Sequence, residues 1–386
     1  MRVTFFSNYL NHHQLPFCQE MQKLTNNEFT FVATTPIEVE RVNMGYIDMN
    51  HKYEFVLNSY ESGENKNKAY ELAEKSDIVI SGSAPFDFIK KRIMQNKLTF
   101  KYSERIYKKG IHWYKIPYDI LMAWIRFGRY QKYNWYLLCS SAYASKDYAL
   151  YGNFINKAYK WGYFPETKIY DIEKLLKNKN DKTTLLWVGR FIELKHPELA
   201  INLAEKLKKL EFNFDLNLIG TGDLEDKIKS MIKNKNLDEN VHILGAMSPE
   251  EVRKYMEKSN IFLFTSDFNE GWGAVLNEAM NSACAVIASN AIGSVPFLIK
   301  DGKNALIFKN QNQEDLNKKV IQLINNPNKI KLLGKEAYKT MIEEWNAKVA
   351  AERLIKISNE LLIKNNSNIF KEGPCSKAKI IKKDGI

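Results

Sequence analysis

Short apolar runs alternate along the chain with stretches in which apolar residues recur at helical spacing. In the second half, the run 185–188 ends in a glycine, and Pro197 then opens a stretch with apolar residues at 199, 200, 203, 204 and 207. An apolar run bounded by turn residues is typical of a buried parallel strand, and the second spacing is typical of an amphipathic helix. The unit recurs, with strands predicted at 215–219, 241–244, 261–264 and 285–288 and helices at about 223–233, from Ser248 and at 275–280. Strict alternation of strand and helix predicts a parallel, doubly wound sheet.

The first half has the same pattern, less regularly. Strands are predicted at 3–6, 29–33, 78–81, 98–102 and 136–139, and helices at about 16–24, 67–74, 85–95 and 142–151. A polar stretch rich in lysine and asparagine, 171–182, separates the two halves. We therefore expect an α/β protein divided into a first domain (1–165), a linker (166–182), a second domain (183–343), a helix returning to the first domain (344–363) and a basic, poorly ordered tail (364–386).

The composition is that of a globular protein, and it predicts the cellular compartment, the state of the cysteines and the charge of the partner. Of its 386 residues 45% are apolar and 26% charged, and no apolar run approaches the length of a membrane-spanning helix. The first residues are too short an apolar run for a signal peptide, which predicts a cytoplasmic protein. The four cysteines show no metal-binding spacing and are expected to be free thiols. The net charge of +12 favours an anionic partner, which could be nucleic acid, an acidic membrane surface or a phosphorylated substrate.

The loop after the first predicted strand counts against a nicotinamide or flavin enzyme. It reads Ser-Asn-Tyr-Leu-Asn-His-His over 7–13, where a dinucleotide fold would carry the GxGxxG fingerprint. The pair Gly220 and Gly222 follows a later strand but by itself indicates little. The chain also contains neither a P-loop nor an HExxH motif.

The most informative stretch is 266–280, which follows a predicted buried strand. It therefore lies at the carboxyl end of the sheet, where open α/β sheets bind their ligands. Gly271 and Gly273 allow close approach of the backbone, and the amides that open the following helix attract phosphate. Glu270 in the loop and Glu278 in the helix can each accept hydrogen bonds from sugar hydroxyls.

This stretch resembles the Glu-x7-Glu signature of the family 4 retaining glycosyltransferases, which have the GT-B fold. Gly189-Arg190-Phe191, with Lys195 five residues after the arginine, is similar to the Gly-Arg…Lys pattern of that family. The segments 286–289 and 301–306 are similar to its next strand and its following Asp-Gly loop, so the ordered set extends over about 180 residues. The resemblance implies two Rossmann-like doubly wound domains that face a central cleft, the first for the acceptor and the second for the nucleotide-sugar donor.

Residue roles follow from the resemblance. It implies that Arg190 and Lys195 hold the diphosphate of a nucleotide-sugar and stabilise the leaving group, that Glu270 contacts the transferred sugar and that Glu278 binds the ribose hydroxyls. Arg190, Lys195 and Glu270 are thus the expected catalytic residues. The complete expected donor set is Gly189, Arg190, Lys195, Glu270, Gly271, Trp272, Gly273, Ala274, Val275 and Glu278. The resemblance implies neither a metal nor another cofactor, with the two cations and the helix terminus in the place of a metal, and transfer with retention of configuration.

Each of these residues also has an ordinary structural explanation. An Arg-x4-Lys pair also occurs at solvated helix starts, and Glu278 alone would be an ordinary acid on a helix surface. The chain also departs from the family pattern at 281–285 and at 292–296, where the family often has Gly-Gly-x-x-Glu. The second departure lies near the family's donor site, so the identity of the base and of the sugar stays open.

Acceptor residues are less distinctive. His12 and His13 lie in the first loop and could contact donor phosphate or an acceptor hydroxyl, or could simply brace the loop. Ser103, Glu104 and Arg105 end the strand predicted at 98–102, where they could bind the acceptor or cap a helix. His112 is a weaker candidate.

The segment 98–136 carries twelve aromatic residues and eight Lys or Arg against two acids. Such a mixture suits an anionic membrane surface or a polyprenyl-diphosphate-linked acceptor, although an aromatic core with a solvated basic face has the same composition. Together with the donor motifs, the resemblance implies a hexosyltransferase (EC 2.4) of bacterial capsule or O-antigen assembly, with a glycan or lipid-linked glycan acceptor. It would be cytoplasmic and peripheral at the inner membrane face. The rivals are a nucleotide-sugar 2-epimerase of the same fold, a non-catalytic scaffold and a nucleic-acid-binding protein; nucleic acid is not the expected partner.

Overall fold

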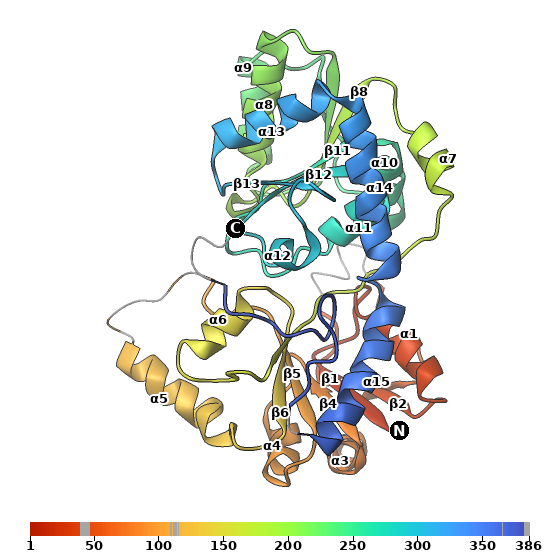
Figure 1. Ribbon diagram of the computed structural model, residues 1–386, viewed down its shortest axis with the longest axis vertical. Helices are drawn as coiled ribbons and strands as arrows, with labels where there is room; N and C mark the ends of the chain where they lie inside the picture. The colour runs from red at the N-terminus through yellow and green to blue at the C-terminus, as the bar shows by residue number, and fades with distance from the viewer. Residues whose placement is uncertain (39–46, 109, 111–113, 115, 365, 382–386) are drawn as a thin grey trace. The chain divides into compact units, whose positions relative to one another are not determined.

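The computed structural model describes residues 1–38, 47–108, 110, 114, 116–364 and 366–381, and it divides the chain into two compact units. Unit 1 comprises residues 1–166 and 345–385, and unit 2 comprises residues 167–344. Each unit is a parallel sheet with helices packed on it (Figure 1). The predicted fold class, two parallel, doubly wound α/β domains, is confirmed.

The sheet of unit 1 has the strand order β3-β2-β1-β4-β5-β6-β7, and every pair of neighbouring strands is parallel. Its strands are β1 (Val3–Ser7), β2 (Phe29–Ala33), β3 (Val56–Asn58), β4 (Ile78–Ser81), β5 (Thr99–Ser103), β6 (Trp135–Cys139) and β7 (Ala158–Lys160). Its helices are α1 (Leu15–Leu24), α3 (Gly63–Lys75), α4 (Asp87–Met94), α5 (Ile116–Arg126), the 3-10 turn η2 (Gly128–Tyr130), α6 (Ala144–Ala149) and α15 (Ala347–Ile363). The five predicted strands are present, whereas the three-residue edge strands β3 and β7 and the aromatic helix α5 were not predicted.

The sheet of unit 2 has the strand order β10-β9-β8-β11-β12-β13, again parallel throughout. Its strands are β8 (Thr183–Val188), β9 (Phe214–Ile219), β10 (Val241–Ile243), β11 (Ile261–Phe264), β12 (Ala285–Ser289) and β13 (Leu306–Phe308). Its helices are α7 (Ile172–Lys177), η3 (Glu193–Lys195), α8 (Pro197–Lys209), α9 (Glu225–Asn234), α10 (Pro249–Lys258), α11 (Val275–Asn281), α12 (Val295–Leu298), α13 (Gln313–Ile324) and α14 (Pro327–Glu343). Helices α8 and α13 lie side by side, and their apolar residues share one buried cluster with residues of all six strands.

The segment expected to be a linker is a packed part of unit 2. Lys179 explains why, because its ammonium donates to the carbonyl oxygens of Ser259 (2.7 Å) and Ser282 (3.0 Å) beyond the ends of two helices. Such C-terminal carbonyls have no partner within their helix and attract a cation. Tyr170 adds a second anchor, since its backbone N–H donates to the Tyr338 hydroxyl at 2.8 Å. At least one lysine of this lysine-rich segment therefore binds helix ends, and the segment is not a flexible linker.

After α14 the chain passes into unit 1, where α15 packs along α1 (Figure 1). The residues after α15 were expected to be poorly ordered, and for 366–381 that expectation is wrong. The backbone of Cys375 donates to Lys160 O (2.8 Å), Lys160 donates to Ser376 O (2.7 Å) and Ala378 donates to Ala158 O (3.0 Å). The tail thus pairs antiparallel with the open edge of β7, and Cys375 is buried. Edge pairing uses backbone groups, so a polar, lysine-rich sequence does not prevent it.

Candidate functional site

The topology of unit 2 selects one place for a ligand. The chain runs outward from β8 in both directions, so β8 and β11 are neighbours whose following loops diverge to opposite sides of the sheet. Such a switch point at the carboxyl ends of the strands is where doubly wound folds bind their ligands. The loop after β8 carries Gly189, Arg190 and Lys195, and the loop after β11 carries Glu270. Two motifs separated by some 75 residues in the sequence therefore meet at the switch point.

Buried hydrogen bonds tie the two loops together. The indole N–H of Trp187 donates to Thr265 Oγ1 (2.9 Å), and the Thr265 hydroxyl donates to the carbonyl oxygen of Lys195 (2.6 Å). The backbone N–H of Asp267 donates to Leu194 O at 2.9 Å. Because Trp187 and Thr265 are fully buried, these bonds lie in a low-dielectric environment and hold the Lys195 loop in register with the Glu270 loop.

Lys195 and Glu270 form an ion pair between the two loops, with side chains only 16% and 13% exposed. The Lys195 ammonium also lies 5.8 Å from the centre of the Phe264 ring. A cation and a hydrogen-bond acceptor are thereby fixed side by side in a largely desolvated place. Such a pair can hold a phosphate oxygen and a sugar hydroxyl at neighbouring positions.

Arg190 lies one residue after Gly189 and is exposed. Within the part of the chain that the structure describes, its guanidinium makes no ion pair. It is therefore a cation at the rim of the switch point, whereas Lys195 is held inside it. The helix-start alternative does not fit Lys195, which ends the 3-10 turn η3 and points at the other loop.

Gly220 and Gly222, which carried little weight in the sequence, shape the Gly189–Arg190 loop. A Cβ on Gly220 would lie 1.9 Å from the carbonyl oxygen of Gly189, and one on Gly222 would lie 2.6 Å from that of Phe191. Both residues also have positive φ angles, 134° and 153°. Only glycine lets the loop after β9 approach so closely, so the pair is required by backbone packing next to the site.

The loop 271–275 has mixed roles. Gly273 has a φ of 79° and its Cβ would lie 2.3 Å from the Phe264 ring, which explains the glycine. Trp272 is buried, and its indole N–H donates to Asn277 Oδ1 at 2.9 Å, so its side chain fixes the loop to α11. Gly271 is buried, while Ala274 and Val275 are half-buried where α11 begins. Backbone amides, and not side chains, are what this loop can offer to a ligand.

Glu278 lies on α11 with a side chain 22% exposed, and a buried arginine stands behind it. The Arg253 guanidinium lies 4.0 Å from the Glu278 carboxylate and donates to Asn281 Oδ1 at 2.8 Å. Burial raises the pKa of Glu278, and the charge of Arg253 offsets part of that rise. Sequence reasoning missed Arg253, because in α10 it has the spacing of an ordinary surface residue. An acid in this environment differs from an ordinary solvated acid on a helix surface.

Replacing Glu278 by glutamine should change the stability of the protein in a way that depends on pH. A carboxyl whose pKa is higher in the folded than in the unfolded state is neutral in both states at low pH, and it destabilises the fold increasingly as the pH rises above its unfolded pKa. Glu278→Gln should therefore raise the Tm without nucleotide at about pH 7.5, and the gain should shrink as the pH falls towards about pH 4. The exposed Glu239→Gln is the control. An equal gain at both pH values, measured by calorimetry, would contradict the assignment.

His196 is a second residue that the sequence did not reveal. It is not a glycine, yet it has a left-handed backbone (φ 48°, ψ 54°) between η3 and α8. Its ring contacts Glu198 Oε1 (2.7 Å) and Asp267 Oδ2 (3.4 Å) through its two nitrogens. The hydrogen bond to Glu198, with Asp267 adding to it, raises the pKa of His196. The imidazole thus links the residue after Lys195 to the loop that carries Glu270.

In unit 1 the structure brings together three of the five acceptor candidates, His12, His13 and Glu104. The His13 ring stacks on Tyr163 (centroids 4.2 Å apart), and the Tyr163 hydroxyl donates to Glu104 Oε1 at 2.5 Å. Glu104 Oε2 accepts from Lys108 at 2.6 Å, and the His12 ring meets His13 edge to face. Tyr163 was missed because it lies in a segment without a motif. The result is a polar cluster at the carboxyl end of β5.

Ser103 and Arg105 face inward contacts instead. The Ser103 hydroxyl lies 3.0 Å from the Tyr148 hydroxyl, and Arg105 Nε lies 3.5 Å from Asp147 Oδ2 with both side chains nearly buried. Asp147 also accepts the backbone N–H groups of residues 106 and 107. These contacts give Ser103 and Arg105 a structural role in unit 1, although it is not the helix-capping role that was the alternative to acceptor binding. His112 lies outside the described residues.

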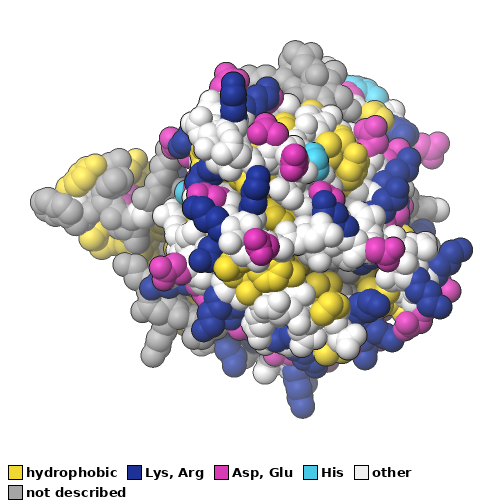
Figure 2. Space-filling view, turned by 90° about the horizontal axis from the view of Figure 1, so that it is seen from above, with side chains coloured by type: hydrophobic (Ala, Val, Ile, Leu, Met, Phe, Trp, Pro, Cys, Tyr) yellow, Lys and Arg dark blue, Asp and Glu magenta, His cyan; other side chains and the backbone are white. Residues whose placement is uncertain are grey.

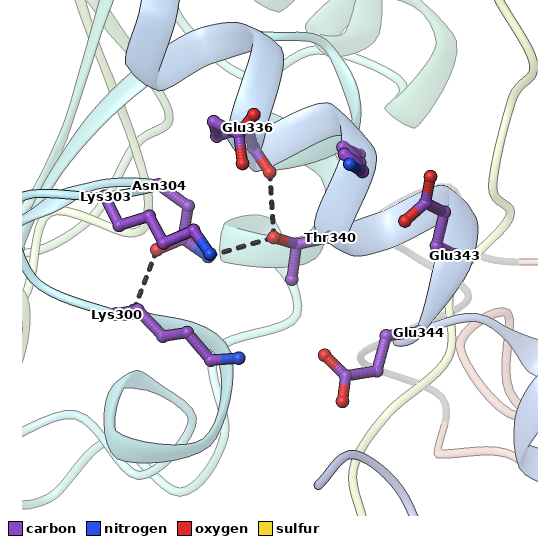
Figure 3. A pocket seen from close by; sticks show the side chains of 8 residues that line it. Lys300, Lys303, Asn304, Glu336, Thr340, Glu343 and Glu344 are labelled. Atoms are coloured by element: carbon purple, nitrogen blue, oxygen red, sulfur yellow. Dashed lines mark hydrogen bonds between the residues drawn. The ribbon is translucent and has the colours of Figure 1, made fainter.

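A separate pocket of unit 2, of about 240 Å³, contains none of the predicted donor residues (Figure 3). Its lining consists of Lys300, Lys303, Asn304, Glu336, Lys339, Thr340, Glu343 and Glu344. Asn304, from the Asp-Gly loop of the sequence motif, donates to the Thr340 hydroxyl at 3.0 Å and so fastens that loop to α14. Three lysines beside three glutamates give this pocket no net attraction for a diphosphate.

Four further observations concern metals, thiols, membranes and nucleic acid. Among the described residues no group of three or more His, Cys, Asp or Glu side chains could hold a metal ion. The four cysteines are free and buried, as expected. No helix in the described ranges is long and apolar enough to cross a membrane. On the face shown in Figure 2, lysine and arginine side chains are interspersed with acidic ones. This face therefore lacks the patch of positive charge that is typical of nucleic-acid-binding proteins.

The second unit is similar to known glycosyltransferases. Residues 169–340 match the family model of the Glycosyl transferases group 1. A poly(ribitol-phosphate) alpha-N-acetylglucosaminyltransferase of Staphylococcus aureus is 30% identical over 172 residues, which cover 45% of this chain and 34% of that protein. An N-acetylgalactosamine-N,N'-diacetylbacillosaminyl-diphospho-undecaprenol 4-alpha-N-acetylgalactosaminyltransferase of Campylobacter jejuni is 32% identical over 132 residues, or 34% of each chain. The chain matches about half or less of the length of such curated relatives.

Among solved structures, that of Anabaena HepE in complex with UDP has a TM-score of 0.69 at 12% identity, and it covers 94% of this chain and 100% of its own. At this identity the likeness establishes the fold alone. Since it extends over both units, the GT-B fold applies to the whole chain and not only to the segment that the family model matches.

Proposed function

We propose that this protein is a retaining glycosyltransferase that moves a sugar from a nucleotide-diphosphate donor to a glycan or lipid-linked glycan. The observation that carries the proposal is the Lys195–Glu270 pair at the switch point of unit 2, with Arg190 on the same loop. The match of residues 169–340 to the Glycosyl transferases group 1 supports it independently.

In the proposed reaction the bond between the sugar and the diphosphate breaks, and negative charge grows on the departing phosphate. Arg190 and Lys195 supply fixed positive charge to that oxygen, which stabilises the transition state more than the ground state. They take the part that a divalent cation plays in other transferases. Glu270 holds hydroxyls of the sugar, and backbone amides of the loop 271–275 bind phosphate oxygens. Retention follows if the acceptor attacks the face that the diphosphate leaves, so that the phosphate itself accepts the acceptor proton.

Glu278 has the environment that a ribose contact requires. A partly buried carboxylate next to Arg253 accepts hydrogen bonds from two hydroxyl groups more strongly than a carboxylate in water, because fewer water molecules compete for it. The raised pKa of the free carboxyl is the cost of that placement.

For the acceptor we propose the cluster of His13, Tyr163 and Glu104 in unit 1. Its carboxylate and imidazole groups suit the hydroxyls of a glycan. Relatives whose names include a poly(ribitol-phosphate) and a diphospho-undecaprenol acceptor support a role in surface polysaccharide assembly. An acceptor of that kind supports a location at the inner face of the cell membrane.

A thermal-shift screen tests the donor site. UDP, GDP, ADP and dTDP, with their sugars, are added to the full chain, and one nucleotide should raise the Tm. At 100 times its Kd a ligand adds about 2.7 kcal/mol of stability. If none of them changes the Tm, the donor assignment is wrong. Product analysis with the stabilising nucleotide-sugar then distinguishes transfer from the rival epimerase, which would return an altered nucleotide-sugar without any acceptor.

A further inference from the structure

Helix α5 of unit 1 exposes five large apolar side chains to solvent. Ile116, Tyr118, Ile120, Leu121 and Trp124 are 38%, 62%, 51%, 54% and 57% exposed, and Ala123 is the one buried residue of this helix. Single exposed apolar residues are normal, but a contiguous group of this kind marks an interaction surface.

Four of the five exposed apolar residues, Ile116, Ile120, Leu121 and Trp124, lie on one face of the helix, and Tyr118 lies outside that face. Residues 116, 120 and 124 follow one another at a spacing of four, and Pro117 and Leu121 form the adjacent row. In an α-helix these positions stack into a single stripe. Asp119 and Arg126, seven residues apart, share the opposite side. The helix is therefore amphipathic, but its apolar face is the one left uncovered.

Basic residues without acidic partners follow the apolar face. Arg126, Arg129 and Lys132 are exposed, and no ion pair involves them in the described part of the chain. Arg129 instead lies over the Tyr130 ring, 4.8 Å from its centre. Nearby, Lys108 and Arg105 are neutralised by Glu104 and Asp147, which leaves the positive charge concentrated at the carboxyl end of α5.

We propose that α5 docks this protein on an anionic lipid bilayer. The stripe of Ile116, Ile120, Leu121 and Trp124 enters the boundary between headgroups and acyl chains, and Arg126, Arg129 and Lys132 contact headgroup phosphates. An eleven-residue helix is about 16 Å long, too short to cross a bilayer, so it lies in the plane of the surface. Aromatic and basic residues together are typical of that interface, whereas a protein partner would not require three unpaired cations. The proposal goes beyond the donor chemistry and does not depend on it.

Flotation with vesicles tests the docking. The full chain should float with vesicles of phosphatidylethanolamine and phosphatidylglycerol, and much less with vesicles of phosphatidylcholine alone. The double variant Leu121→Glu/Trp124→Glu should lower the bound fraction at least tenfold, with an unchanged Tm because both side chains are exposed. Leu332→Glu is the matched control, since Leu332 is 58% exposed on α14 of unit 2, and it should float as the wild type does.

A second arm tests the charges. Arg126→Glu/Arg129→Glu should weaken flotation, and added salt should reduce the difference from the wild type. Wild-type protein that stays off anionic vesicles, or a Leu121/Trp124 variant that floats normally, would overturn the proposal. So would a concentration-dependent dimer that the same variant abolishes, because a second copy would then cover α5. All variants should keep the nucleotide-dependent Tm shift, so failure of the docking and failure of the donor site remain distinguishable.

Discussion

Replacing Lys195 by alanine should lower kcat by about 100-fold to 1000-fold, the loss that follows removal of one charge-stabilising donor from a preorganised site. The variant should also lose most of the Tm shift produced by the stabilising nucleotide. The physical reason is twofold: the departing phosphate loses a fixed cation, and Glu270 keeps its charge in a place where only 13% of its side chain meets water. Initial rates with saturating donor, together with the thermal shift, measure both effects.

Two companion variants show whether the site or the fold is responsible. Lys229→Ala removes a lysine that is 55% exposed and paired with Glu225 on α9, and it should leave rate and nucleotide shift unchanged. Glu270→Gln keeps a hydrogen-bond partner for Lys195 and should lower the rate while preserving nucleotide binding. A Lys195→Ala enzyme with normal turnover would show that the pair is structural only.

Replacing Gly220 by alanine should destabilise unit 2 by at least about 3 kcal/mol, since the new Cβ would lie 1.9 Å from the Gly189 carbonyl oxygen. Neither atom belongs to a flexible side chain, so the backbone next to Arg190 must move. For a unit of this size the Tm should fall by roughly 6–12 °C. Donor binding should fall as well, because the displaced loop carries Arg190.

Gly245→Ala is the matched control for this substitution. Gly220 donates its N–H to Gly245 O (2.8 Å), so the two glycines are neighbours. Gly245 also has a positive φ, 73°, but a Cβ there meets nothing within 4 Å. The Gly245→Ala substitution should lower the free energy of unfolding by only about 1–2 kcal/mol, the penalty for a left-handed backbone at a residue with a side chain. Equal losses of Tm in the two variants would mean that φ, and not the close approach, makes Gly220 necessary.

Much of the fold was predictable because its strands are buried on both faces. Continuous apolar runs such as 185–188 and 261–264 cannot lie at a surface, and their alternation with amphipathic stretches implies parallel crossovers. Elements whose signal is weak were missed for identifiable reasons. Strands β3 and β7 have three residues each, and α5 mixes good helix formers with three isoleucines, a tyrosine and a tryptophan, which do not favour a helix.

The site was predictable in its members but not in its contacts. Glu270, Glu278, Arg190 and Lys195 were identified from motifs, and their catalytic and binding roles remain predictions. The structure adds that Lys195 meets Glu270 directly and that a buried arginine backs Glu278. It also adds that the Trp272 side chain is a packing residue. Partners of this kind are distant in sequence, so no local spacing announces them.

The sequence by itself determined the alternation of strands and helices, the glycine loops and the charged residues available to a donor site, because each depends on local pattern and residue type. Only the tertiary structure decided which of these groups meet. Strand order brought the loops after β8 and β11 together, and close backbone packing made Gly220 and Gly222 necessary. An open strand edge ordered the tail that its composition had marked as loose. The physical reason is the same in each case, since pairing, close approach and burial depend on neighbours that the chain supplies only after it has folded.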